Sequence, residues 1–84
     1  MYRDAVTAYD RVISDYPNSA KVPDAYYKRG LALNVLGQTD RARESWEFAA
    51  KNFPNVDAGR LSRQKLDQLP KRDEAPGEAP ATRP

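Results

Sequence analysis

Apolar positions recur every three or four residues through the first 69 residues of the chain, which is the spacing of amphipathic helices. Prolines and glycines divide this pattern into four segments. The first is predicted to end at Pro17, the second to run from Pro23 to Gly37, the third from an N-cap at Thr39 to Pro54, and the fourth from Ala58 to Pro70. No segment has the alternation of a strand. The pattern therefore predicts an all-α chain of about four antiparallel helices.

Each predicted helix carries one apolar stripe that we expect to be buried. The four stripes are Ala5, Ala8, Tyr9, Val12, Ile13 and Tyr16; Ala25, Tyr26, Gly30, Leu33 and Leu36; Ala42, Trp46, Ala49, Ala50 and Phe53; and Ala58, Leu61, Leu66 and Leu69. The first and third stripes match at an offset of 37 residues, with Ala5 on Ala42, Tyr9 on Trp46 and Pro17 on Pro54. A period of roughly 20–50 residues indicates a solenoid of stacked helix pairs.

The stretch from Pro23 to Asn55 resembles one tetratricopeptide repeat (TPR). Tyr26, Gly30, Leu33 and Gly37 resemble the first-helix pattern of that family, and Ala42, Trp46, Ala49 and Pro54 resemble its second-helix pattern. The resemblance implies a TPR-type α-solenoid fragment made of a half repeat, one full repeat and a capping helix. Arg29 departs from the pattern, which usually has leucine there. We expect its stem to cover apolar surface and its guanidinium to reach water or the face of Trp46.

A narrower resemblance covers about residues 2–69. The segments AVTAYDRVISDYPNSAKVPDAYYKRGLALNVLGQTDRARESWEFAAKNFPN and RQKLDQL are similar to the C-terminal TPR domain of the Tol-Pal system protein family YbgF/CpoB. This resemblance implies a periplasmic protein of the cell envelope that acts with Tol-Pal components in cell division. The TPR lipoprotein of outer-membrane protein assembly uses similar segments and is the alternative.

Composition narrows the kinds of function that the chain can have. The 84 residues contain no cysteine and no histidine, which excludes thiol and histidine chemistry and the usual zinc sites. Glu44 and Glu47 lie among basic residues of one helix, so we interpret them as part of a solvated face. We therefore predict a non-catalytic protein without cofactor or metal.

Neither nucleic acid nor a membrane is predicted as a partner. The net charge is only +2, and the basic group Arg60, Arg63 and Lys65 is flanked by Asp57 and Asp67. No apolar run approaches the roughly 20 residues of a membrane span, and no signal peptide is recognised. The predicted helical domain covers residues 1–69. Residues 70–84 hold four of the chain's seven prolines and are predicted to form a disordered Pro-rich tail.

Two surfaces are candidates for protein contacts. Carried over from the TPR family, the concave groove would be lined by Asp24, Tyr27, Lys28, Leu31, Asn34 and Val35. A mixed apolar and amide surface suits an extended peptide or a helix, although Leu31 and Val35 could equally pack against the next helix. Because Asp24 precedes Lys28, the carboxylate clamp of some family members is not reproduced.

The second candidate surface lies on the first helix, which begins in the middle of a repeat by this resemblance. Its residues Ala5, Tyr9 and Val12 then lack the helix that should pack against them, and solenoids usually need about three repeats. Two explanations stay open. The chain is a fragment of a longer protein, or it forms a homo-oligomer through these three residues.

Overall fold

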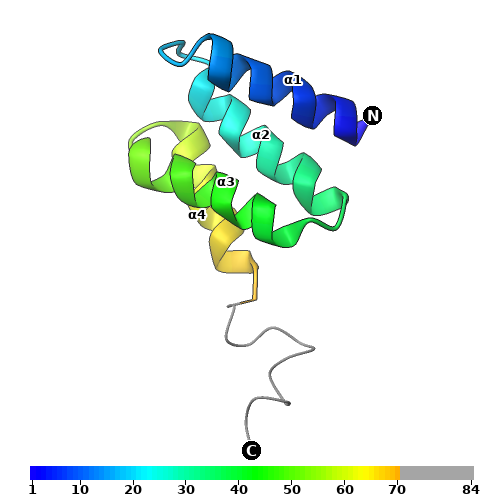
Figure 1. Ribbon diagram of the computed structural model, residues 1–84. Coiled ribbons are helices and arrows are strands. Elements are labelled where there is room, and N and C mark those ends of the chain that lie inside the picture. The colour runs from blue at the N-terminus through cyan, green and yellow to red at the C-terminus, as the bar shows by residue number, and fades with distance from the viewer. Residues whose placement is uncertain (71–84) are drawn as a thin grey trace, which may run out of the picture.

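The computed structural model describes residues 1–70 and consists there of four helices joined by short turns: α1 (Tyr2–Asp15), α2 (Val22–Val35), α3 (Thr39–Asn52) and α4 (Asp57–Gln68). The predicted all-α fold is confirmed. Of the predicted Pro-rich tail, residues 71–84 lie outside the described residues. The helices form a stack in which α2 packs against α1, α3 and α4, and α3 packs against α4 (Figure 1).

The helices end where prolines and a glycine require it. Pro17 and Pro54 each follow the residue that closes α1 or α3, and Gly37 adopts the left-handed backbone conformation at φ 83°. Around Gly37 the amide of Gln38 donates to the carbonyl of Leu33 at 2.9 Å, as in a Schellman cap. The prediction of Thr39 as an N-cap is wrong. Gln38 occupies that position, Thr39 is the first helical residue, and no side chain caps α3.

The backbone repeats itself 37 residues apart. Tyr16 closes α1 with φ −132° and ψ 59°, and Phe53 closes α3 with φ −131° and ψ 53°. In both turns the amide bonds the carbonyl four residues earlier, with N–O distances of 3.0 Å to Val12 and 2.9 Å to Ala49. Residues matched by the sequence offset thus occupy equivalent places, which confirms that α1 and α3 are copies of the same element.

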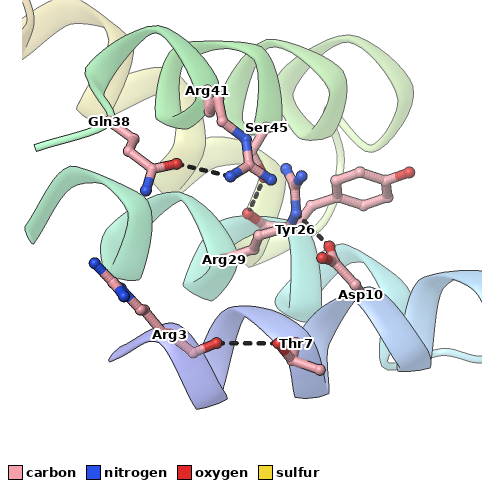
Figure 2. A network of polar contacts seen from close by, with 8 residues as sticks. All are labelled: Arg3, Thr7, Asp10, Tyr26, Arg29, Gln38, Arg41 and Ser45. Atoms are coloured by element: carbon pink, nitrogen blue, oxygen red, sulfur yellow. Dashed lines mark hydrogen bonds and ion pairs between the residues drawn. The ribbon is translucent and has the colours of Figure 1, made fainter. Parts of the chain in front are cut away.

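The core lies between α2 and its neighbours. Its buried cluster consists of Val6, Ala32, Leu33, Ala42 and Trp46. The Trp46 indole packs directly over Gly30, where any Cβ would overlap the ring, and its Nε1 donates to the Tyr27 carbonyl at 3.0 Å. Beside it the Ser45 hydroxyl donates to the Tyr26 carbonyl at 2.7 Å (Figure 2). A glycine and two hydrogen bonds to backbone oxygens therefore set the close approach of α3 to α2.

Two predicted stripes are buried differently from the expectation. In α1 the buried residue is Val6, which lies outside the stripe, whereas Ala8 and Tyr16 are exposed. The reason is that α1 packs mainly on α2, which lies on the Val6 side of the helix. In α4, Leu61 is exposed, and Gly59 and Ser62 are buried instead. Small residues face α3 there because a Cβ at Gly59 would overlap the carbonyl of Phe53.

Arg29 forms an ion pair with a carboxylate of α1, a contact that the sequence did not predict. Its Nε donates to Oδ1 of Asp10 in α1 at 2.6 Å (Figure 2). The side chain of Arg29 is 18% exposed and that of Asp10 is 47% exposed. Because α1 presents a carboxylate directly opposite this position of α2, the two helices are joined by an ion pair.

Candidate functional site

An apolar hollow lies between α1 and α2, and we call it the α1–α2 hollow. It has a volume of about 270 Å³ and is lined by Tyr2, Ala5 and Tyr9 from α1 and by Lys28, Leu31 and Ala32 from α2. Small-molecule pockets usually measure roughly 300–1,000 Å³. The hollow is therefore better matched to one or two side chains of a protein partner than to a cofactor.

A single charged pair stands at the rim of the hollow. Lys28 Nζ lies 3.2 Å from Oδ2 of Asp24, one turn earlier on α2, and both side chains are about half exposed. The hydrogen bond with Asp24, together with its negative charge, raises the pKa of the Lys28 ammonium above its ordinary value. Asp24 is thus the carboxylate that pairs with Lys28 in this structure.

The predicted groove residues are spread along α2. Lys28 and Leu31 line the hollow, and Tyr27 and Leu31 are half-buried and pack against the core cluster. Asn34 and Val35 are exposed at the end of α2, with Val35 59% exposed. The alternative interpretation, that these two residues pack against a neighbouring helix, therefore holds for Leu31 and does not hold for Val35. Contact of the six residues with a partner stays a prediction.

Two of the three residues predicted for self-association also line the α1–α2 hollow. Ala5 and Tyr9 line the α1–α2 hollow together with Lys28 and Leu31, and Val12 is half-buried one turn further along α1. The sequence predicts two separate contact surfaces, a groove on the second helix and a face on the first helix. In the structure these two candidate surfaces meet, so substitutions at Tyr9 and Leu31 cannot distinguish between them.

A larger and more open depression lies between α3 and α4. It measures about 620 Å³ and is lined by Arg43, Glu47, Lys51, Arg63, Leu66 and Asp67. Its lining combines charged side chains of both signs and includes no serine, threonine or aromatic residue. Glu44, the other carboxylate considered for catalysis, is exposed on α3. Arg60, from the basic group, bonds Oδ1 of Asp57 at 2.6 Å. These are the contacts of solvated helix faces.

Residues 1–70 present no cluster of three or more metal-ligating side chains. None of the four described helices is long and apolar enough to cross a membrane.

Sequence reasoning missed two residues that line the hollow and one exposed aromatic residue on α3. Tyr2 and Ala32 line the hollow, and Phe48 is 44% exposed on α3, where its ring stacks on Tyr26 with centroids 4.4 Å apart. Tyr2 lies one heptad before Tyr9, so a helix begun at residue 2 would have placed it near the same face. Phe48 lies outside the apolar stripe of α3. Its contact with Tyr26 depends on the orientation of α2 and has no signal in the sequence.

Comparison with known proteins gives one family. The sequence model described as the tetratricopeptide repeat matches residues 1–19 and 24–55. The interruption between the two matches, residues 20–23, covers the end of the turn between α1 and α2 and the first two residues of α2. No curated protein and no solved structure matches the chain.

Proposed function

The chain belongs to the tetratricopeptide repeat family, whose repeats generally mediate protein–protein interaction, and we propose that the α1–α2 hollow is where this chain contacts its partner. The hollow is the single observation that carries the proposal. It gathers two tyrosines, a leucine and two alanines beside one ion pair. Apolar pockets with aromatic walls are the places where a few residues of a partner contribute most of the binding energy. Contact with a protein partner at this hollow requires no catalytic residue.

We further propose that the partner is a component of the Tol-Pal system and that the chain acts in the periplasm during cell division. This assignment rests on the similarity of the segments over residues 2–69 to the YbgF/CpoB family. A TPR lipoprotein of outer-membrane protein assembly is the alternative within the same compartment. Fractionation of cells that express the full-length protein tests the compartment, and recovery in the cytoplasm would contradict both assignments.

Photo-crosslinking from single positions tests the site and the partner together. Tyr2 lines the hollow and is 51% exposed, whereas Tyr16 is 65% exposed and lies outside it. With p-benzoylphenylalanine at position 2, we expect a crosslink to a Tol-Pal component, and with the same group at position 16 we expect none. Equal crosslinking at both positions would contradict the site. A position-specific crosslink to an unrelated protein would contradict only the Tol-Pal assignment.

Self-association of the chain is the second candidate function. The observation in its favour is that Ala8 is exposed and that Ala5, Tyr9 and Val12 are only half-buried on α1. Sedimentation velocity over a range of concentrations tests it. A mass that doubles with concentration supports a structural role, and a constant monomer mass contradicts it.

A further inference from the structure

A second hollow lies between α1 and α3, beside the turn that follows α2, and we call it the α1–α3 hollow. Its volume is about 280 Å³. The residues of its lining that matter here are Arg3, Val6 and Asp10 from α1, Leu36 and Gln38 from the turn, and Arg41 from α3. None of its lining residues belongs to the α1–α2 hollow, so the two hollows are separate candidate sites.

The two arginines that line this hollow form no ion pair within residues 1–70. The ion pairs in that part of the chain join Lys28 to Asp24, Arg29 to Asp10 and Arg60 to Asp57. Asp10 lines the hollow, but its Oδ1 already accepts the hydrogen bond of Arg29 at 2.6 Å. Arg41 donates through Nη1 to the neutral Oε1 of Gln38 at 2.7 Å, and Arg3 is exposed. Three guanidinium groups thus face a single carboxylate.

The placement of Arg3 and Arg41 indicates what kind of anion suits the hollow. Arg3 extends from α1 towards α3, and Arg41 extends from α3 towards α1 (Figure 2). A guanidinium group matches the two oxygens of a carboxylate with two parallel hydrogen bonds. Because the two arginines belong to different helices on opposite sides of the hollow, they suit two carboxylates better than one small anion.

The hollow also offers apolar surface next to these charges. Val6 is 7% exposed and Leu36 is half-buried, so both lie deeper than the two exposed arginines. The methylene groups of a glutamate side chain can contact these two residues while its carboxylate reaches an arginine. The lining therefore combines the charge and the apolar contact that an acidic segment of protein requires.

We propose that the α1–α3 hollow binds an acidic segment of a partner protein, with one carboxylate on Arg3 and another on Arg41. Complementary charge of this kind speeds association and favours partners of the right charge. This inference goes beyond the proposed function and does not rest on it, because it uses none of the residues of the α1–α2 hollow.

A short labelled peptide in which glutamate and serine alternate provides the probe, and the same peptide with glutamine in place of glutamate is its control. Fluorescence anisotropy of each peptide is measured against the full 84-residue chain. We expect saturable binding of the glutamate peptide that weakens as salt is added, and binding at least about tenfold weaker for the glutamine peptide. Equal binding of the two peptides, or no binding of the glutamate peptide, would overturn the inference.

Two double variants of equal net charge distinguish the site from general attraction. Arg11 and Arg63 are exposed on α1 and α4, and neither lines the α1–α3 hollow. Arg3→Gln with Arg41→Gln is expected to weaken binding of the glutamate peptide about tenfold, whereas Arg11→Gln with Arg63→Gln is expected to change it by less than about twofold. Circular dichroism shows that both variants fold. Equal weakening by the two pairs contradicts the inference, since net charge alone would then explain the binding.

NMR of the unaltered chain locates the peptide directly. The glutamate peptide is expected to shift the Nε–H signals of Arg3 and Arg41 and to leave that of Arg11 in place; an equal shift of all three contradicts the site. Inorganic phosphate that binds these arginines more tightly than the peptide contradicts the choice of an acidic segment.

Sedimentation velocity of the full chain and its variants tests a second copy as the occupant. We expect no dimer that depends on Arg3 and Arg41. A dimer that Arg3→Gln with Arg41→Gln abolishes contradicts the choice of a partner protein, because a second copy would then fill the hollow. Crosslinking from position 2 reports on the α1–α2 hollow alone, so failure of this inference is distinguishable from failure of the proposed function.

Discussion

At the scale of single residues, Arg29 shows how a departure from the repeat pattern is accommodated. The equivalent residue 37 positions later is Leu66, which packs against the core cluster from α4. Arg29 and Leu66 are both half-buried, so one kind of position holds a charged side chain in α2 and an aliphatic one in α4. The charge is tolerated in α2 because Asp10 of α1 lies within 2.6 Å.

Replacing Arg29 tests how much this ion pair contributes. Arg29→Leu is expected to leave the free energy of unfolding unchanged or to raise it by up to about 1 kcal/mol, since leucine needs no partner and leaves Asp10 half-exposed to water. Arg29→Ala is expected to lower it by about 1–2 kcal/mol, because the packed stem is lost as well. Urea unfolding measures both values. If Arg29→Leu lowered the free energy of unfolding as much as Arg29→Ala does, the ion pair itself would be required for stability.

Lys28 gives a prediction that depends on pH. Because Asp24 raises the pKa of Lys28, the pair stabilises the fold at neutral pH, and this contribution disappears as the pH rises through the raised pKa. Asp24→Asn is expected to lower the pKa of Lys28 towards its ordinary value. An NMR titration of the lysine side chain measures this directly. An unchanged pKa in the variant would contradict the assigned cause.

The buried residues of α3 could be predicted from sequence, but their polar contacts could not. The periodic spacing identified Ala42, Trp46 and Ala49, and all three are buried. The pairing of Arg29 with Asp10 was missed because it depends on how two helices are rotated relative to each other, which no local pattern specifies. Ser45 was missed for a similar reason, since its burial depends on the Tyr26 carbonyl of the neighbouring helix, which accepts its hydroxyl proton.

At the scale of the elements, helix ends were more predictable than helix faces. Proline and glycine act through their own backbone restrictions, so Pro17, Gly37 and Pro54 marked the ends of three helices correctly. The face that a helix buries depends on where its neighbours lie. In α1 the stripe recognised from sequence faces away from the described helices in part, and Val6 became the buried residue because α2 covers the other side.

At the scale of the whole molecule, the two ends of the stack differ. At one end α4 carries exposed charged and amide residues, namely Arg63, Gln64 and Asp67, which suit contact with water. At the other end α1 presents a face of exposed or half-buried residues, namely Ala5, Ala8, Tyr9 and Val12, beside a hollow shared with α2. The sequence repeat predicted that the first helix lacks a partner. The predicted groove and this face share one hollow because of the way α1 packs against α2. This packing could not be predicted from the sequence.

The central claim is that α1 and α3 are copies of one element and differ because only α3 is covered on both sides. Amide hydrogen exchange of the full chain in dilute solution tests this most directly. The amides of Tyr9 and Val12 are expected to exchange at least about tenfold faster than those of Trp46 and Ala49, because local opening of α1 exposes less buried surface. Equal protection of the two pairs would contradict the claim.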